Sequence, residues 1–79
     1  MATILFTVTH GSDDPTRATL PFVGAVGALA EGHTPQIALL GEGAYLALPH
    51  VLDAVHGIGF PPLRDLFAKI REHEVPVFV

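Results

Sequence analysis

The sequence predicts one α/β domain over residues 1–79, with a doubly wound parallel sheet and helices on both faces. Two observations lead to this fold class. Segments with strand and helix character follow one another in the order β-α-β-α-α-β, which is typical of parallel sheets joined by helical crossovers. The first strand is apolar on both of its sides, as expected where helices cover each face of a sheet.

The first strand is expected over Thr3–Thr9, since Ile4, Leu5, Phe6 and Val8 break the alternation of a half-exposed strand. The polar loop 10–17 follows it. These two segments place a loop at the carboxyl end of a buried strand, which is where ligands bind in sheets of this class.

A long helix is expected after this loop. Asp13 or Asp14 can cap its first turn, and Pro15 suits the first helical position. The helical pattern continues to about Glu31. Pro21 lies inside the pattern, so the sequence predicts either a kink there or a later start of the helix.

The middle of the chain predicts a second strand at Pro35–Leu40, a turn at 41–43 and a short helix at 44–48 that Pro49 ends. One or two further helical turns are expected over 51–56. The loop 57–62 then leads to the last helix.

That last helix is expected from Pro62 to about Glu74, because apolar residues recur there at the spacing of one helix face. The third strand is expected at Val75–Val79. A domain seldom stops inside a buried strand, so two interpretations remain open. Either the chain closes its sheet with its own last residues, or a C-terminal part of the protein is missing after Val79.

The composition predicts a further covering surface. Hydrophobic residues make up 49% of the chain and charged residues 15%, whereas soluble domains average about 25% charged. A domain of this size has too much surface to bury such a composition alone. We therefore expect either a homo-oligomer or a longer chain.

Several functional classes are disfavoured. The net charge of −4 and the lack of a basic cluster argue against nucleic acid, and no apolar run reaches the length of a membrane span. The N-terminus lacks a signal peptide, so a cytoplasmic location is expected. The chain has no Cys, and its five His show no metal-binding spacing, so neither a metal nor a cofactor is expected.

The loops after the first two strands contain the candidates for ligand binding. They are His10, Gly11, Asp13, Arg17, Gly41, Glu42, Gly43 and Tyr45. The simpler interpretation is a capped helix start followed by a polar turn, with Arg17 paired to the neighbouring acids. A third interpretation pairs His10 with Glu42 as general acid and base. No catalytic residue is assigned, because no substrate-fixing group accompanies that pair.

The segment 45–60 contains many apolar residues and one formal charge. It supplies the candidates for an interface, which are Leu48, Val51, Leu52, Val55, Ile58 and Phe60. Two interpretations have equal weight. These side chains either fill the core beneath the last helix or form the contact surface of an oligomer.

Four segments, taken in order, carry a resemblance to a known family. ILFTVTHGSDDPTRATLPF, GHTPQIALLGEGAYLA, GFPPLRDL and VPVFV resemble the DsrE/DsrF-like sulfur-relay proteins, some of which are described as peroxiredoxin-like. The resemblance implies a flavodoxin-like topology, trimers or hexamers, and cytoplasmic sulfur metabolism with sulfur donor and acceptor proteins. It also implies a persulfide-carrying Cys just after the third strand, which in this chain would lie beyond Val79. Without that Cys, the alternative is a non-catalytic oligomeric module that binds a small ligand or a protein.

Overall fold

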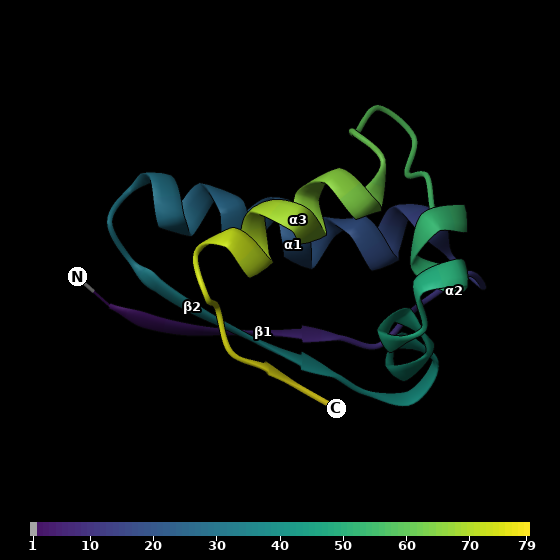
Figure 1. Cartoon of the computed structure of the whole chain (residues 1–79), viewed down its shortest axis with the longest axis horizontal. Coiled ribbons are helices and arrows are strands. Elements are labelled where there is room, and N and C mark those ends of the chain that lie inside the picture. Colours follow the sequence, from purple (N-terminus) through teal and green to yellow (C-terminus); the bar gives the residue numbers. More distant parts are fainter. Residues whose placement is uncertain (1) are drawn as a thin grey trace.

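The computed structural model describes residues 2–79 and has a three-stranded parallel sheet in the order β1-β2-β3 (Figure 1). The chain runs through β1 (Thr3–Val8), α1 (Pro15–Ala30), β2 (Thr34–Leu39), the 3-10 helix η1 (Gly41–Ala47), α2 (Pro49–Ala54), α3 (Leu63–Glu72) and β3 (Val77–Phe78). The predicted α/β class and the predicted order of elements are therefore confirmed.

Both long helices lie on the same side of the sheet (Figure 1). Helix α1 connects β1 to β2, and α3 lies on the path from β2 to β3. Because right-handed crossovers that proceed in one direction across a sheet place their helices on one face, α1 and α3 pack side by side. Helices on both faces, as a doubly wound sheet requires, are not seen within residues 2–79.

The burial of β1 follows from this one-sided cover. Val8 is fully buried and Phe6 packs against the core, whereas Leu5 on the opposite side is 55% exposed. Strand β2 alternates in the same way, with Pro35, Ile37 and Leu39 buried. The prediction that β1 is covered on both faces is therefore wrong for the described residues.

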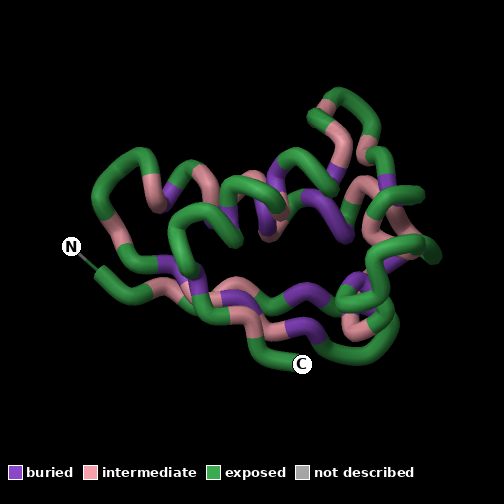
Figure 2. The backbone as a smooth tube through the Cα atoms, viewed as in Figure 1, coloured by how far each residue is buried: buried purple, intermediate pink, exposed green. Residues whose placement is uncertain are grey.

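The uncovered side of the sheet is a continuous surface, which we call the open face. Alternation along the strands and the register between them assign it the following residues: Thr3, Leu5, Thr7, Thr34, Gln36, Ala38 and Phe78. Leu40 directly follows β2 in an extended conformation and continues the same alternation. In Figure 2 the strands alternate along their length between buried positions and exposed or intermediate ones, as expected where one face is covered.

The core lies between the sheet and the two helices. Its largest fully buried side chains include Phe22 from α1, Ile37 from β2, Leu46 from η1, and Leu63 and Ile70 from α3. Small residues let α1 approach the strands closely. A Cβ added at Gly24 would lie 2.7 Å from the Phe6 ring, so the helix backbone itself packs on that ring.

The start of α1 agrees with the prediction. The Asp14 side chain accepts a hydrogen bond from the Arg17 backbone N–H at 3.1 Å, and Pro15 occupies the first turn. Pro21 lies within the helix, which begins at Pro15, so the alternative of a later start is wrong.

Two predicted boundaries in the middle of the chain differ from the structure. The turn at 41–43 is part of η1, which begins at Gly41. Pro49 begins α2 at a position where its missing N–H costs nothing, instead of only ending the preceding helix.

The third strand is shorter than predicted. β3 is limited to Val77–Phe78, and Phe78 and Val79 are 55% and 78% exposed. It is not a buried strand, because it pairs with β2 at two positions only and has no cover on its outer side. None of the helices in residues 2–79 has the length and apolar character needed to cross a membrane.

Candidate functional site

The loops that follow β1 and β2 touch each other at the carboxyl edge of the sheet, as predicted. A Cβ added at Gly11 would lie 2.6 Å from the Glu42 carbonyl oxygen, and one added at Gly43 would collide with the Val8 carbonyl. Both glycines are therefore needed for close approach. What they approach is the backbone of the neighbouring segment.

This contact fills the space between the two glycines in the region where a ligand was predicted. Gly11 and Gly43 are buried, and the Leu46 side chain behind them is 1% exposed. Gly41 supplies the left-handed conformation that begins η1, with φ +55°. The predicted crevice between 10–13 and 41–45 is thus a packed joint between two segments.

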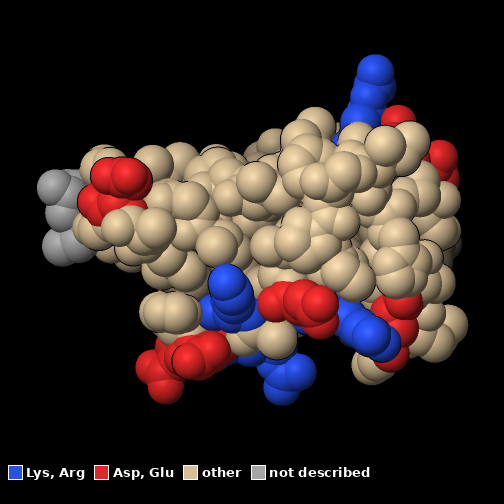
Figure 3. Space-filling view, turned by 90° about the horizontal axis from the view of Figure 1, so that it is seen from above, with Lys and Arg blue, Asp and Glu red and all other residues tan. Residues whose placement is uncertain are grey.

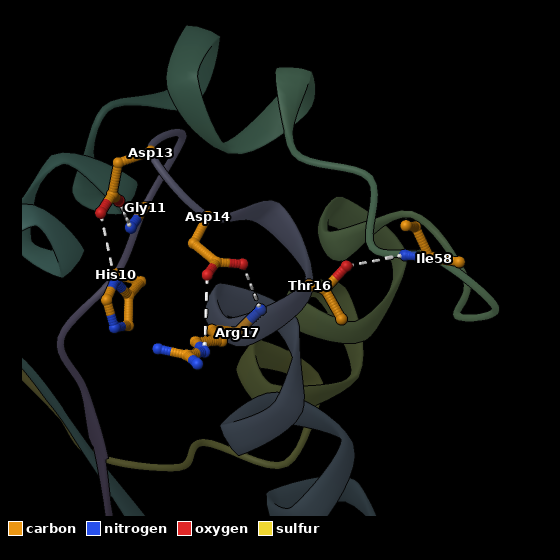
Figure 4. A network of polar contacts seen from close by, with 7 residues as sticks. All are labelled: His10, Gly11, Asp13, Asp14, Thr16, Arg17 and Ile58. Carbon is orange, nitrogen blue, oxygen red and sulfur yellow. Dashed lines mark hydrogen bonds and ion pairs between the residues drawn. The ribbon is translucent and has the colours of Figure 1, made fainter.

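His10 and Asp13 form the polar part of this joint (Figure 4). The Asp13 carboxylate accepts a hydrogen bond from the Gly11 N–H at 2.7 Å and contacts the His10 Nδ1 at 3.1 Å. The backbone hydrogen bond from Gly11, followed by the contact with His10, lowers the pKa of the Asp13 carboxyl below its ordinary value of 3.8. The carboxylate partner of His10 is therefore Asp13, and no contact with Glu42 is found in residues 2–79.

Arg17 pairs with the acid that caps α1, as predicted. Its Nε lies 3.5 Å from the Asp14 carboxylate, and its side chain is 69% exposed. Such an exposed pair contributes at most about 1 kcal/mol to stability. Arg17 is accordingly a surface group beside the cap, separate from the His10–Asp13 contact (Figure 4).

The remaining two candidates of the second loop face solvent. Glu42 is exposed, and Tyr45 is 55% exposed with no hydrogen bond from its hydroxyl group within residues 2–79. The acid/base interpretation paired His10 with Glu42, and no hydrogen bond or ion pair joins these two side chains within residues 2–79. Ligand binding by these eight residues stays a prediction.

The six interface candidates divide between core and surface. Val55 is buried, and Val51 and Leu52 pack against the core. Leu48 and Ile58 are 44% and 87% exposed, and Phe60 is intermediate between buried and exposed. The core interpretation therefore accounts for half of the set, and an interface stays a prediction for the exposed members.

One hydrogen bond in this region was not predicted from the sequence. The Ile58 N–H donates to the Thr16 hydroxyl at 3.1 Å, which fastens the loop between α2 and α3 to the first turn of α1 (Figure 4). A Thr in a helix start carries no sequence signal for a partner 42 residues away. This hydrogen bond holds the backbone of the loop at Ile58, although the Ile58 side chain itself is exposed.

Two clefts lie away from this joint. One, of about 340 Å³, lies between the last turns of α1 and α3. The other, of about 250 Å³, lies between α3 and the η1–α2 segment and is lined by Arg64, Arg71 and Asp53 in addition to apolar groups. None of these three was singled out in the sequence, although the spacing of seven residues places both arginines on one side of a helix.

The described residues gather no group of three or more His, Asp or Glu side chains that could hold a metal ion. Compared with family models, curated proteins and solved structures, the chain matches none of them significantly. The likeness to sulfur-relay proteins therefore stays a prediction from the sequence.

Proposed function

We propose that this chain is a non-catalytic α/β module that acts by association, and that the open face of its sheet binds a second copy of the chain. The observation that carries the proposal is the chemistry of this face. Leu5, Leu40 and Phe78 are 55%, 48% and 55% exposed there. Parallel sheets are normally covered on both faces, and this one has helices on one side within residues 2–79.

Charge supports the same conclusion. The chain has twelve formally charged residues, four basic and eight acidic, yet none of them belongs to the open face. Each half-exposed large side chain there would gain about 1 kcal/mol on becoming buried. A second open face is a matching surface, because it is equally uncharged and a two-fold axis pairs each patch with itself.

The size of the face predicts how strong the association is. Two strands about 20 Å long and a third about 7 Å long, spaced about 4.8 Å apart, give a footprint of roughly 200 Å². A standard interface buries about 800 Å² on each partner. The account therefore predicts weak, concentration-dependent dimerisation.

The trimers or hexamers implied by the family resemblance need a further surface. One self-complementary face closes after two copies. Leu48 and Ile58 are the exposed members of the predicted interface set and could supply that second contact.

The test is sedimentation equilibrium of the purified chain over a concentration series. Leu5→Lys places a charge on the open face, whereas Leu20→Lys places one at a similarly exposed leucine on α1, on the other side of the molecule. Association lost in Leu5→Lys and kept in Leu20→Lys is the expected result. A wild-type chain that stays at 8.4 kDa throughout contradicts the proposal.

A second candidate function is favoured by the four quoted segments of the sequence. In this proposal the chain belongs to intracellular, cytoplasmic sulfur metabolism and carries a persulfide between a donor and an acceptor protein. Residues 1–79 contain no Cys, so the proposal assigns the sulfur-carrying Cys to residues that follow Val79. It also implies a doubly wound, flavodoxin-like sheet, in which added helices would cover the open face instead of a second copy.

The intact mass of the protein from its natural source separates these two candidates. The sulfur-relay proposal predicts a mass well above 8.4 kDa and a persulfide that alkylation blocks. A natural protein without Cys would exclude it and leave the associating module.

A further inference from the structure

The cleft between α3 and the η1–α2 segment has a rigid apolar floor. It has a volume of about 250 Å³, and its floor includes Leu46, Leu52 and Phe67. Leu46 is 1% exposed, so it belongs to the core and cannot shift freely. Phe67 is held by Phe22, whose ring centroid lies 5.7 Å away. A preformed apolar floor of this kind suits a flat organic group.

Two arginines also line this cleft. Arg64 and Arg71 lie on α3 two turns apart, about 10 Å along the helix axis, and both line the cleft. Ala68 lies between them, and its small side chain leaves the space between the arginines open. Three of the four basic residues of the chain belong to α3. Figure 3 shows basic side chains along one long edge of the molecule, with acidic side chains between them.

These arginines have little competition for an external anion. The Arg64 Nε lies 3.8 Å from the carboxylate of its neighbour Asp65, in a pair with both side chains about 60% exposed. No ion pair of Arg71 is found in residues 2–79. The two arginines and Asp53, which belongs to α2, together give the residues that line the cleft a formal charge of +1. A single negative charge on a ligand would neutralise this excess.

We infer that this cleft binds a small aromatic monocarboxylate, with its ring on the floor of Leu46, Leu52 and Phe67 and its carboxylate between Arg64 and Arg71. Guanidinium groups recognise carboxylates through paired N–H donors, and the apolar floor supplies the rest of the contact. The site is separate from the open face, so it does not depend on the proposed association.

The probe is 2-naphthoate, titrated into ¹⁵N-labelled protein at low ionic strength, with 2-naphthalenemethanol as the uncharged control. Saturable shifts are expected at the amides of Leu52, Phe67 and Ala68. Arg64→Gln and Arg71→Gln are each expected to raise the dissociation constant about fivefold, and added salt to raise it further. Asp53→Asn is expected to lower it.

Two matched variants keep the test decisive. Arg17→Gln removes an exposed arginine from α1, away from the cleft, and is expected to leave the affinity unchanged. Ala68→Leu fills the space between the arginines with a good helix former and is expected to abolish binding. Equal binding of the alcohol, equal effects of Arg71→Gln and Arg17→Gln, or shifts confined to the open face would each overturn the inference.

Discussion

Both faces of the sheet carry large apolar side chains, but these reach opposite degrees of burial. Val8 and Ile37 on the helix side are fully buried, whereas Leu5 and Phe78 on the open face are each 55% exposed. All three strands contribute apolar side chains to both sides. The helix-side positions of β1 and β2 are all apolar, whereas the open face also carries Thr3, Thr7 and Gln36. The difference in burial therefore follows both from composition and from which neighbours cover each side.

By this comparison, one side of the sheet stabilises the fold and the opposite side is available for association. The helix side supplies the burial that holds the fold together. The open face keeps apolar area available for a partner. The predictions below test this division, beginning with the largest expected effect.

The strongest test replaces the same residue type on each side. Phe22→Ala empties a fully buried core position and is expected to lower the free energy of unfolding by about 3–5 kcal/mol. Phe78→Ala on the open face is expected to cost less than about 1 kcal/mol in the monomer. Urea unfolding followed by circular dichroism at low protein concentration measures both.

A domain of this size has a total stability of only about 4–12 kcal/mol, so Phe22→Ala could leave the chain largely unfolded. Phe22→Leu provides a graded alternative, with an expected loss of about 1–2 kcal/mol. Equal losses at the two phenylalanines would show that the open face is already covered in the monomer.

The joint between the two loops offers a second matched pair. Gly43→Ala drives a methyl group into the Val8 carbonyl and is expected to cost at least about 2 kcal/mol. Gly27→Ala, within α1, meets nothing within 4 Å and is expected to stabilise the chain by up to about 1 kcal/mol. Thermal unfolding of the two variants should therefore shift in opposite directions; a neutral Gly43→Ala would mean that the joint is loose.

The cap of the first helix has a smaller expected effect. Asp14→Ala removes the acceptor for the Arg17 N–H and should lower the free energy of unfolding by about 1 kcal/mol. Asp14→Asn keeps a capping oxygen and should recover most of this loss. Equal losses of stability in the two variants would show that the negative charge of Asp14 contributes more to stability than its capping hydrogen bond.

The smallest expected effect is the change in stability with pH that comes from Asp13. Because the pKa of Asp13 is lowered in the folded chain, its contribution to stability is complete above the ordinary value of 3.8 and is lost as the pH falls through the lowered value. Asp13→Asn should flatten this part of the stability curve. An unchanged acid slope in urea titrations at pH 2–5 would contradict the role of the Gly11 and His10 contacts.

The sequence predicted the elements whose signals are local. The boundaries of β1, α1 and β2 agree within one residue, because Pro15 and the capping Asp14 act on their own neighbourhood. The exposure of Leu5 could not be predicted, since it depends on which face α3 covers. The glycines indicated a close approach, but only the assembled sheet shows that Gly11 and Gly43 approach backbone.

The cleft residues illustrate the same limit. Arg64 and Arg71 are ordinary surface positions in a helical pattern, and their common cleft exists only because η1 and α2 fold back toward α3. Leu46, which lines that cleft, belongs to a short segment whose 3-10 conformation has no distinct sequence signal.

The most direct test of the central claim is a dilution series of amide spectra, which identifies the surface that becomes buried on association. The account predicts concentration-dependent shifts at Leu5, Ala38, Leu40 and Phe78, with Leu20 unchanged. Shifts confined to Leu48 and Ile58 would assign association to the other exposed apolar surface. Spectra that do not change with concentration would contradict self-association of the chain.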